Sequence, residues 1–302
     1  MSPTCISRPK IPVELLLDVV SFYMESLPLR GRPRPKPAWA LVEPVSLVCH
    51  VLRRATLKAW FKTLCVRDKS DLLAIQRDWP ELHRWVRTFV CIFPDPKDDV
   101  DWDLGGFDCL DAVSVQMSTG VHAYPFTRFI NVPQSVETLD LTGMAEAGPM
   151  QMRAVAETFP TIRTLKMQPF YTWCGLCNTN ELSSFSAEVP SLLVYEGGIG
   201  LPMHFGKFLA PLTALETFCI TTVYDEHMIL GDAQSPYDEI GKNENIWVGE
   251  CQSCMRFLYP DDVFREGWVA KKKEPEVRLP VLKKVEWAFM TESDLYETWL
   301  LF

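Results

Sequence analysis

One short pattern of apolar residues returns along most of this chain, and it constrains the fold more than any other feature. The pattern is apolar-x-x-apolar-x-apolar, where x is any residue. Six close copies begin at Val86, Leu110, Val136, Ile162, Leu215 and Leu282, and two looser copies begin at Leu192 and Met255. Successive copies follow at similar intervals, and the one long interval lies between Leu215 and Met255. Such a repeat predicts that each copy belongs to one supersecondary unit and that successive units stack on one another.

Each copy predicts a short β-strand. In the third close copy, Leu139 and Leu141 point to one face of the strand and Asp140 points to the other. Residues 150–159 carry apolar side chains at helical spacing, and prolines before several copies end the preceding helix or turn. The sequence therefore predicts an α/β fold over residues 80–302, in which parallel strands with helical or irregular returns form a curved solenoid with a strand-lined concave face.

Residues 80–302 resemble an irregular, degenerate leucine-rich-repeat domain. Most of the intervals between copies lie near the repeat length that is typical of such domains, roughly 20 to 29 residues. No copy carries the asparagine position of the regular repeat. The longest interval contains a polar, acidic and turn-rich stretch, residues 223–247, which predicts a long loop. Such a loop is either functional or a tolerated insertion, and the sequence favours neither.

The N-terminal part of the chain, as far as position 65, predicts three short helices. The first covers residues 11–24, and its apolar residues predict one broad stripe that consists of Leu15, Leu16, Val19, Val20 and Tyr23. The second starts after Pro44 and includes residues 46–55, and the third follows over residues 56–64. Three short helices make a thin core, so we expect apolar surface to remain for contact with another chain.

Charge and composition exclude several classes of protein. The net charge is −9, but residues 1–70 carry +7 and the remaining residues therefore carry −16. Opposite charges on the two regions predict two partners, and the acidic larger region would repel nucleic acid. No stretch reaches the roughly 18 apolar residues of a membrane span, and the first residues lack the apolar core of a signal peptide. We expect a soluble, intracellular protein, cytoplasmic or nuclear, that binds no membrane and keeps its ten cysteines reduced.

The stretch IPVELLLDVV (residues 11–20), followed by SLVC (residues 46–49), resembles an F-box. The usual pattern of that family is Leu-Pro-x-Glu-Leu-Leu, a few residues, Ser-Leu-Val-Cys and a basic helix, in which Arg53 and Arg54 would stand. The resemblance implies that residues 11–65 pack on a Skp-type adaptor. It also implies that the apolar contact with the adaptor comes from Pro12, Leu15, Leu16, Val19, Leu47 and Val48.

An F-box in front of irregular leucine-rich repeats resembles a set of fungal proteins. The resemblance implies a non-enzymatic substrate-recognition subunit of an SCF-type (cullin-RING) E3 ubiquitin ligase, without cofactor or metal. The adaptor would connect it to the cullin complex, and residues 80–302 would bind an unknown target protein. The alternative is a repeat scaffold for protein–protein interaction, unconnected to a ubiquitin ligase, in which the N-terminal helices only cover the first repeat.

A third hypothesis is a metal-dependent or redox protein built on two cysteine pairs. Cys174 and Cys177 are spaced like a redox CxxC motif, and Cys251 and Cys254 form a second such pair. Zinc is held by four thiolates in compact motifs, whereas these two pairs are far apart in the sequence, which favours ordinary buried or loop cysteines. Residues 98–106 begin like a calcium loop but lack its glycine and its final glutamate, so a solvated acidic turn is expected.

Overall fold

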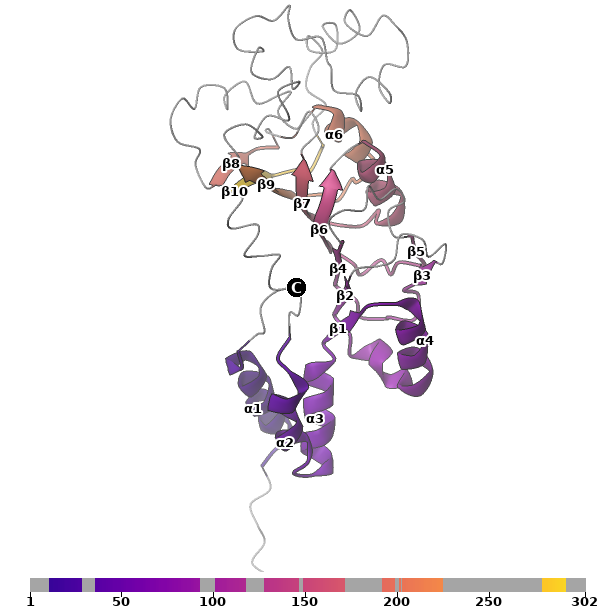
Figure 1. Ribbon diagram of the computed structural model, residues 1–302, viewed down its shortest axis with the longest axis vertical. Helices are drawn as coiled ribbons and strands as arrows, with labels where there is room; N and C mark the ends of the chain where they lie inside the picture. Colours follow the sequence, from indigo (N-terminus) through magenta and orange to yellow (C-terminus); the bar gives the residue numbers. More distant parts are fainter. Residues whose placement is uncertain are drawn as a thin grey trace, which may run out of the picture.

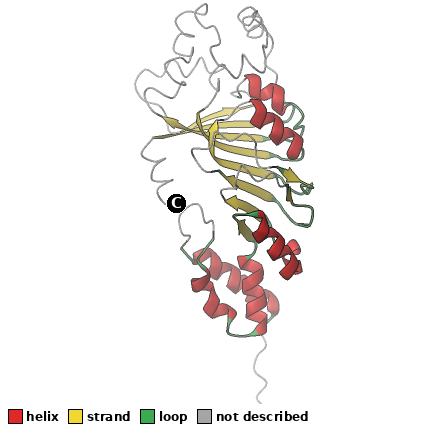
Figure 2. Cartoon of the chain, turned by 45° about the vertical axis from the view of Figure 1, so that its right-hand side comes forward, coloured by secondary structure: helices red, strands yellow, loops and turns green. Residues whose placement is uncertain are grey.

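The computed structural model describes residues 11–28, 36–92, 101–117, 128–146, 149–171, 192–198, 201, 203–224 and 279–291. These residues form a mixed α/β fold around one large sheet (Figure 1, Figure 2). The helices are α1 (Val13–Ser26), α2 (Trp39–Ser46), α3 (His50–Trp60), α4 (Lys69–Asp78), the 3-10 helix η1 (Pro80–Arg84), α5 (Pro149–Thr158) and α6 (Met203–Leu209). The strands are β1 (Thr63–Val66), β2 (Thr88–Ile92), β3 (Trp102–Asp103), β4 (Ala112–Gln116), β5 (Phe129–Ile130), β6 (Thr138–Glu146), β7 (Thr164–Tyr171), β8 (Leu192–Glu196), β9 (Thr217–Tyr224) and β10 (Lys284–Thr291).

The large sheet has eight strands in the order β1-β2-β4-β6-β7-β9-β10-β8. Every neighbouring pair is parallel except β10 and β8, which are antiparallel. The strands β3 and β5 form a separate parallel pair. The helices α4, α5 and α6 lie on one side of the large sheet (Figure 1), and α5 packs against α6. The prediction of an α/β fold with mostly parallel strands is confirmed.

Each close copy of the sequence pattern contains one strand of this sheet, namely β2, β4, β6, β7, β9 and β10. The looser copy at Leu192 forms β8, but this strand lies at the edge of the sheet beyond β10 and runs in the opposite direction. The looser copy at Met255 lies outside the described residues. The predicted loop at 223–247 begins inside β9, and the rest of it also lies outside the described residues.

The apolar positions of the close copies form the core of the sheet region. All of them are buried in one hydrophobic cluster: Val86, Phe89, Cys91, Leu110, Val113, Val115, Val136, Leu139, Leu141, Ile162, Leu165, Met167, Leu215, Phe218, Ile220, Leu282, Val285 and Trp287. Strand pairing aligns them in rows, so that Val113, Leu139 and Leu165 are direct neighbours on β4, β6 and β7. A shift of one residue would turn a strand's apolar side chains out of the core, and the pattern therefore sets the register.

The structure corrects the second predicted helix. The helix α2 spans Trp39–Ser46 and includes Pro44 near its end, so it finishes where the predicted helix was to begin. Residues 47–49 then separate α2 from α3, because Cys49 is extended with φ −163° and ψ 167° and serves as the N-cap of α3. Pro44, which was expected to precede the second helix, thus lies in the last turn of α2.

The third predicted helix, residues 56–64, is also wrong in part, because α3 ends at Trp60 and the chain continues as strand β1. Leu64 and Val66 of β1 are buried and belong to the sheet's core cluster. The sequence contained the signal for this strand, since FKTLCV, residues 61–66, fits the repeat pattern one repeat length before the copy at Val86. The sheet therefore begins with a repeat that the sequence analysis did not recognise.

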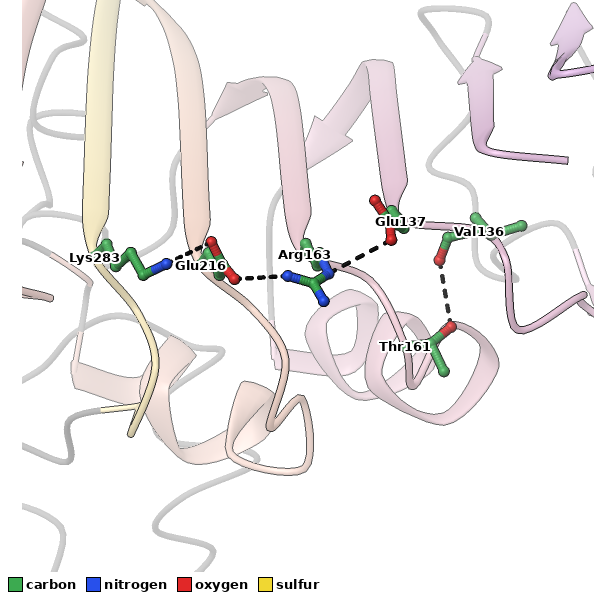
Figure 3. A network of polar contacts seen from close by, with 6 residues as sticks. All are labelled: Val136, Glu137, Thr161, Arg163, Glu216 and Lys283. Atoms are coloured by element: carbon green, nitrogen blue, oxygen red, sulfur yellow. Dashed lines mark hydrogen bonds and ion pairs between the residues drawn. The ribbon is translucent and has the colours of Figure 1, made fainter.

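Charged residues lie directly before several strands and form ion pairs across the N-terminal ends of these strands (Figure 3). Glu216 accepts hydrogen bonds from Arg163 Nη1 and from Lys283 Nζ, each at 2.8 Å. Arg163 Nε also lies 3.5 Å from Glu137 Oε1. Glu216 is partly exposed and its partners are exposed, so each pair alone contributes little, but together the pairs connect β6, β7, β9 and β10. The hydrogen bond from Lys283, with a further contribution from Arg163, holds the pKa of Glu216 below its ordinary value.

The Glu216→Gln variant tests this network. The lowered pKa of Glu216 means that its contribution to stability is present above the carboxyl's unfolded-state pKa and is lost as the pH falls through its folded-state pKa. We expect Glu216→Gln to lower the melting temperature at pH 7 and to lower it less at an acidic pH, where the carboxylate of Glu216 becomes protonated. Glu137→Gln, whose contact is longer, should have a smaller effect. Equal losses for Glu216→Gln at both pH values would contradict this account.

Two glycines after β8 bring that strand against β10. Gly197 and Gly198 have φ of 76° and 77°, a backbone region that residues with a Cβ rarely adopt. The N–H of Gly197 donates to the carbonyl of Lys283 at 2.8 Å. A Cβ at Gly198 would lie 2.6 Å from the carbonyl oxygen of Leu282, whereas a Cβ at Gly197 would have no neighbour within 4 Å. The close approach of two backbones therefore requires glycine at 198.

Alanine substitutions at the two glycines separate backbone strain from steric overlap. We expect Gly197→Ala to lower the free energy of unfolding by about 1 kcal/mol, because only the left-handed conformation is penalised. Gly198→Ala carries the same strain and in addition forces a carbonyl away, so we expect a further loss of about 1–3 kcal/mol. Urea denaturation measures both values. Equal losses at the two positions would show that the contact with Leu282 does not matter.

Candidate functional site

The helices α1, α2 and α3, here called the helical unit, have a small core of their own. The helix α3 packs against both α1 and α2. The fully buried apolar side chains of the unit are Val20, Val42 and Ala55, and none of them belongs to the core cluster of the sheet. Tyr23 Oη donates to the carbonyl of Leu41 at 2.6 Å and joins α1 to α2. A core of this size leaves much of the unit's apolar surface uncovered.

The helix α1 is apolar on two neighbouring faces, one covered and one exposed. On the inner face, Val20 is 2% exposed, and Leu16 and Tyr23 are partly buried. The outer face carries four exposed side chains at helical spacing: Ile11 just before the helix, Leu15, Val19 and Phe22. Val19 is 63% exposed and Phe22 is 76% exposed. A helix that only packs on its own domain has one apolar face, so the outer face indicates a second contact.

A second group of exposed apolar residues lies at the break between α2 and α3. Leu47 is 69% exposed and Val48 is 67% exposed, and Val51 in the first turn of α3 is also exposed. Within the part of the chain that the structure describes, ten of the fifteen large exposed apolar side chains fall between Ile11 and Val51. The uncovered apolar surface of the protein is therefore concentrated in the helical unit, and it is the best candidate for a functional site.

The residues that the F-box resemblance singled out are mostly accessible. Five of them are exposed in the structure: Pro12, Leu15, Val19, Leu47 and Val48. Leu16 is partly buried on the inner face, so the single stripe predicted for this helix is in fact two stripes. Sequence reasoning missed Ile11 and Phe22. Their helical spacing from Leu15, one turn before it and two turns after it, was the signal that could have found them.

Charges of opposite sign lie on different helices of the unit. Glu14, Asp18 and Glu25 are exposed on α1, in positions that share one side of the helix. On α3, the exposed charges are basic: Arg53, Arg54 and Lys58. None of these six side chains makes an ion pair with another described residue. The two sets remain available to charges on a partner.

The face of the sheet opposite α4, α5 and α6 carries polar residues in rows. Strand pairing aligns Ser114, Asp140, Lys166, Cys219 and Glu286 on neighbouring strands. The thiol of Cys219 donates to Glu286 Oε2 at 2.9 Å. Burial and this hydrogen bond raise the pKa of Cys219 to about 12, so the thiol is not a nucleophile at neutral pH. Lys166 is exposed in the middle of this face.

The structure gives the acidic turn a local role. Asp103 Oδ1 accepts hydrogen bonds from the backbone of Gly105 at 2.9 Å and from Asn131 Nδ2 at 3.2 Å. Asp101 Oδ1 lies 3.2 Å from Arg128 Nε. Among the residues that the structure describes, no three His, Cys, Asp or Glu side chains come together in a way that would hold a metal ion.

The cysteine pairs proposed for zinc or redox chemistry, Cys174 with Cys177 and Cys251 with Cys254, lie outside the described residues.

Comparison of the chain with models of protein families finds no match, and no curated protein matches its sequence. Of the helices in the described residues, none combines the length and apolar character that crossing a membrane requires.

Alanine substitutions at two adjacent valines test the two-faced character of α1. Val20→Ala removes a buried side chain, and we expect the melting temperature of the helical unit to fall, by the equivalent of about 2 kcal/mol. Val19→Ala removes an exposed side chain, and we expect a change within about 0.5 kcal/mol. Thermal unfolding followed by far-ultraviolet circular dichroism checks both values. A large loss for Val19→Ala would mean that the outer face is already covered.

Proposed function

We propose that this protein is a non-catalytic substrate-recognition subunit of an SCF-type (cullin-RING) ubiquitin ligase. The helical unit binds a Skp-type adaptor, and the sheet region binds the protein to be ubiquitinated. The observation that carries this proposal is the uncovered apolar surface of the helical unit, on α1 and at the break between α2 and α3. The ubiquitin transfer is carried out by other subunits.

The size of this surface supports an obligatory partner. Each large apolar side chain that passes from full exposure to burial stabilises a complex by roughly 1.5–3 kcal/mol before the costs of association. Phe22, Val19, Leu47 and Val48 are all more than half exposed. Exposed apolar groups gathered on one small unit, while the sheet region buries its own apolar positions, are typical of a docking surface.

The positions of the F-box-like motifs agree with this use. The stretch IPVELLLDVV forms the start of α1, with Pro12 at its N-cap, and SLVC covers the end of α2 and the break before α3. Both motifs therefore contribute to the exposed apolar surface, through Leu15 and Val19 in the first and through Leu47 and Val48 in the second.

The charges of the helical unit indicate which charges a complementary adaptor would carry. An apolar groove on the adaptor would receive α1, with basic groups beside Glu14, Asp18 and Glu25. Acidic groups of the adaptor would approach Arg53, Arg54 and Lys58 of α3. Charges of this kind at the rim of an interface affect the rate of association and the choice of partner more than the affinity.

The sheet region supports a degenerate leucine-rich-repeat arrangement for target binding. One strand per repeat, six close copies in unbroken spatial order and a shared register are features of such stacks. The polar face with Lys166 and Glu286 is the candidate surface for the target, because α4, α5 and α6 lie on the other face (Figure 1). The antiparallel edge strand β8 departs from a regular repeat.

Co-purification with a Skp-type adaptor tests the proposal. We expect the wild-type chain to retain the adaptor and the double variant Leu15→Asp/Val19→Asp to lose at least about 100-fold in affinity, because two charges would be buried against an apolar groove. Leu73→Asp on α4 is the matched control, since Leu73 is 54% exposed and Leu15 is 53% exposed. Circular dichroism confirms that all variants fold.

Failure of the wild-type chain to bind a purified Skp-type adaptor would overturn the proposal. The alternative, a repeat scaffold, is supported by one observation. The helical unit stands next to β1, the edge strand where a stack of repeats needs a cover (Figure 1). A folded chain that retains no adaptor would favour this scaffold.

A further inference from the structure

The helical unit and the sheet region meet at a short connection. The helix α3 ends at Trp60 and β1 begins at Thr63, so only Phe61 and Lys62 join them. The two regions have separate hydrophobic cores, and Phe61 is the side chain of this connection that packs against the core of the sheet. Two bodies with separate cores and a short connection keep one relative orientation only if other contacts hold it.

Lys36, which precedes α2 in the sequence, supplies such a contact. Its Nζ lies 3.3 Å from the centre of the Trp60 ring and 5.4 Å from the centre of the Phe61 ring. The same Nζ donates a hydrogen bond to the backbone carbonyl of Thr63 at 3.2 Å. One ammonium therefore contacts the last residue of α3, the connection and the first residue of β1.

Aromatic rings extend this contact in both directions. Trp39 of α2 lies 5.1 Å from Trp60, and Trp60 lies 4.9 Å from Phe61, between ring centres. Phe61 lies 6.1 Å from Trp79, which follows α4 on the side of the sheet region. Trp60 Nε1 also donates to the carbonyl of Pro37 at 3.3 Å. The rings form a chain from α2 to the end of α4, and Lys36 lies against its middle.

The environment of Lys36 is unusual for a lysine. Burial lowers its pKa to about 8, because the ammonium has lost most of its water. No carboxylate among the described residues forms an ion pair with it. The face of Trp60, within the helical unit, and the carbonyl of Thr63, the first residue of β1, are its compensation. The contact with Thr63 exists only while the helical unit keeps its present position against β1.

We propose that Lys36 is an orientation clamp, whose ammonium fixes the angle between the helical unit and the sheet region. A partner on the outer face of α1 and a partner on the sheet are then held at one distance and direction. The clamp does not rest on the proposed function, since it acts within the chain and requires no particular partner.

Distance measurements in the full-length chain test the clamp. Spin labels are attached through non-canonical amino acids at Ser21 on α1 and at Glu157 on α5, both exposed, so that the native cysteines remain unlabelled. We expect one narrow distance distribution in the wild-type background. In Lys36→Met, which keeps an apolar stem without the charge, we expect the ratio of clamped to unclamped molecules to fall by about 30-fold and the distribution to broaden.

Two control variants make the result specific to the ammonium. Lys62→Met changes an exposed lysine in the same connection and should leave the distribution narrow. Lys36→Arg keeps a cation that stacks on tryptophan and should restore most of the narrow distribution. An unchanged distribution in Lys36→Met would overturn the proposal, and so would equal broadening in Lys36→Arg or in Lys62→Met. Circular dichroism of each variant verifies that both regions are folded, so that broadening reports orientation.

Discussion

The burial of the repeated apolar positions in one continuous cluster is the constraint on which the rest of this structure depends. In each repeat, one apolar residue before the strand and two alternating residues of the strand point to the core, as do Val136 before β6 and Leu139 and Leu141 within it. Because neighbouring strands share one register, these side chains form rows across the sheet. The same register places the charged residues before the strands side by side, where Arg163 and Glu216 pair. The buried core and the ion pairs at the start of the strands thus both follow from the shared register of the strands.

The helical unit is subject to the opposite constraint. Its helices are too short to enclose a large core, and Val20, Val42 and Ala55 are its only fully buried apolar side chains among the described residues. Many of the remaining large apolar side chains are exposed, and burying them against another protein would be favourable. The two regions therefore differ: the sheet region buries the apolar positions of its repeats, whereas the helical unit leaves many large apolar side chains exposed. The hydrogen bond from Lys36 to Thr63 and the ring contact between Phe61 and Trp79 connect the two.

Strong local periodicity made much of this fold predictable. The strands from β2 to β10 that follow the close copies, and the helix α1, lie where the pattern placed them. The failures have physical causes. Pro44 was read as a helix start, although a proline near the end of a short helix removes few hydrogen bonds. The predicted third helix included residues 61–64, although the partner that decides their structure is the neighbouring strand β2. Of the six contact residues that the F-box resemblance implied, five are exposed and Leu16 is partly buried, and the resemblance did not include Ile11, Phe22 or Val51.

The repeated apolar pattern is enough to place the strands β2, β4, β6, β7, β9 and β10 and their inward faces, because a period of two leaves only one way to bury the apolar residues of a strand. The sequence by itself also determined that α1 is helical and apolar. Only the tertiary structure decided which face of α1 is covered, since Leu15 and Val20 are equally apolar and the difference lies in the presence of α3 beside one of them. The same is true of β8, whose place beyond β10 depends on a strand that comes much later in the chain. Contacts between distant segments select among faces and edges that local periodicity leaves equivalent.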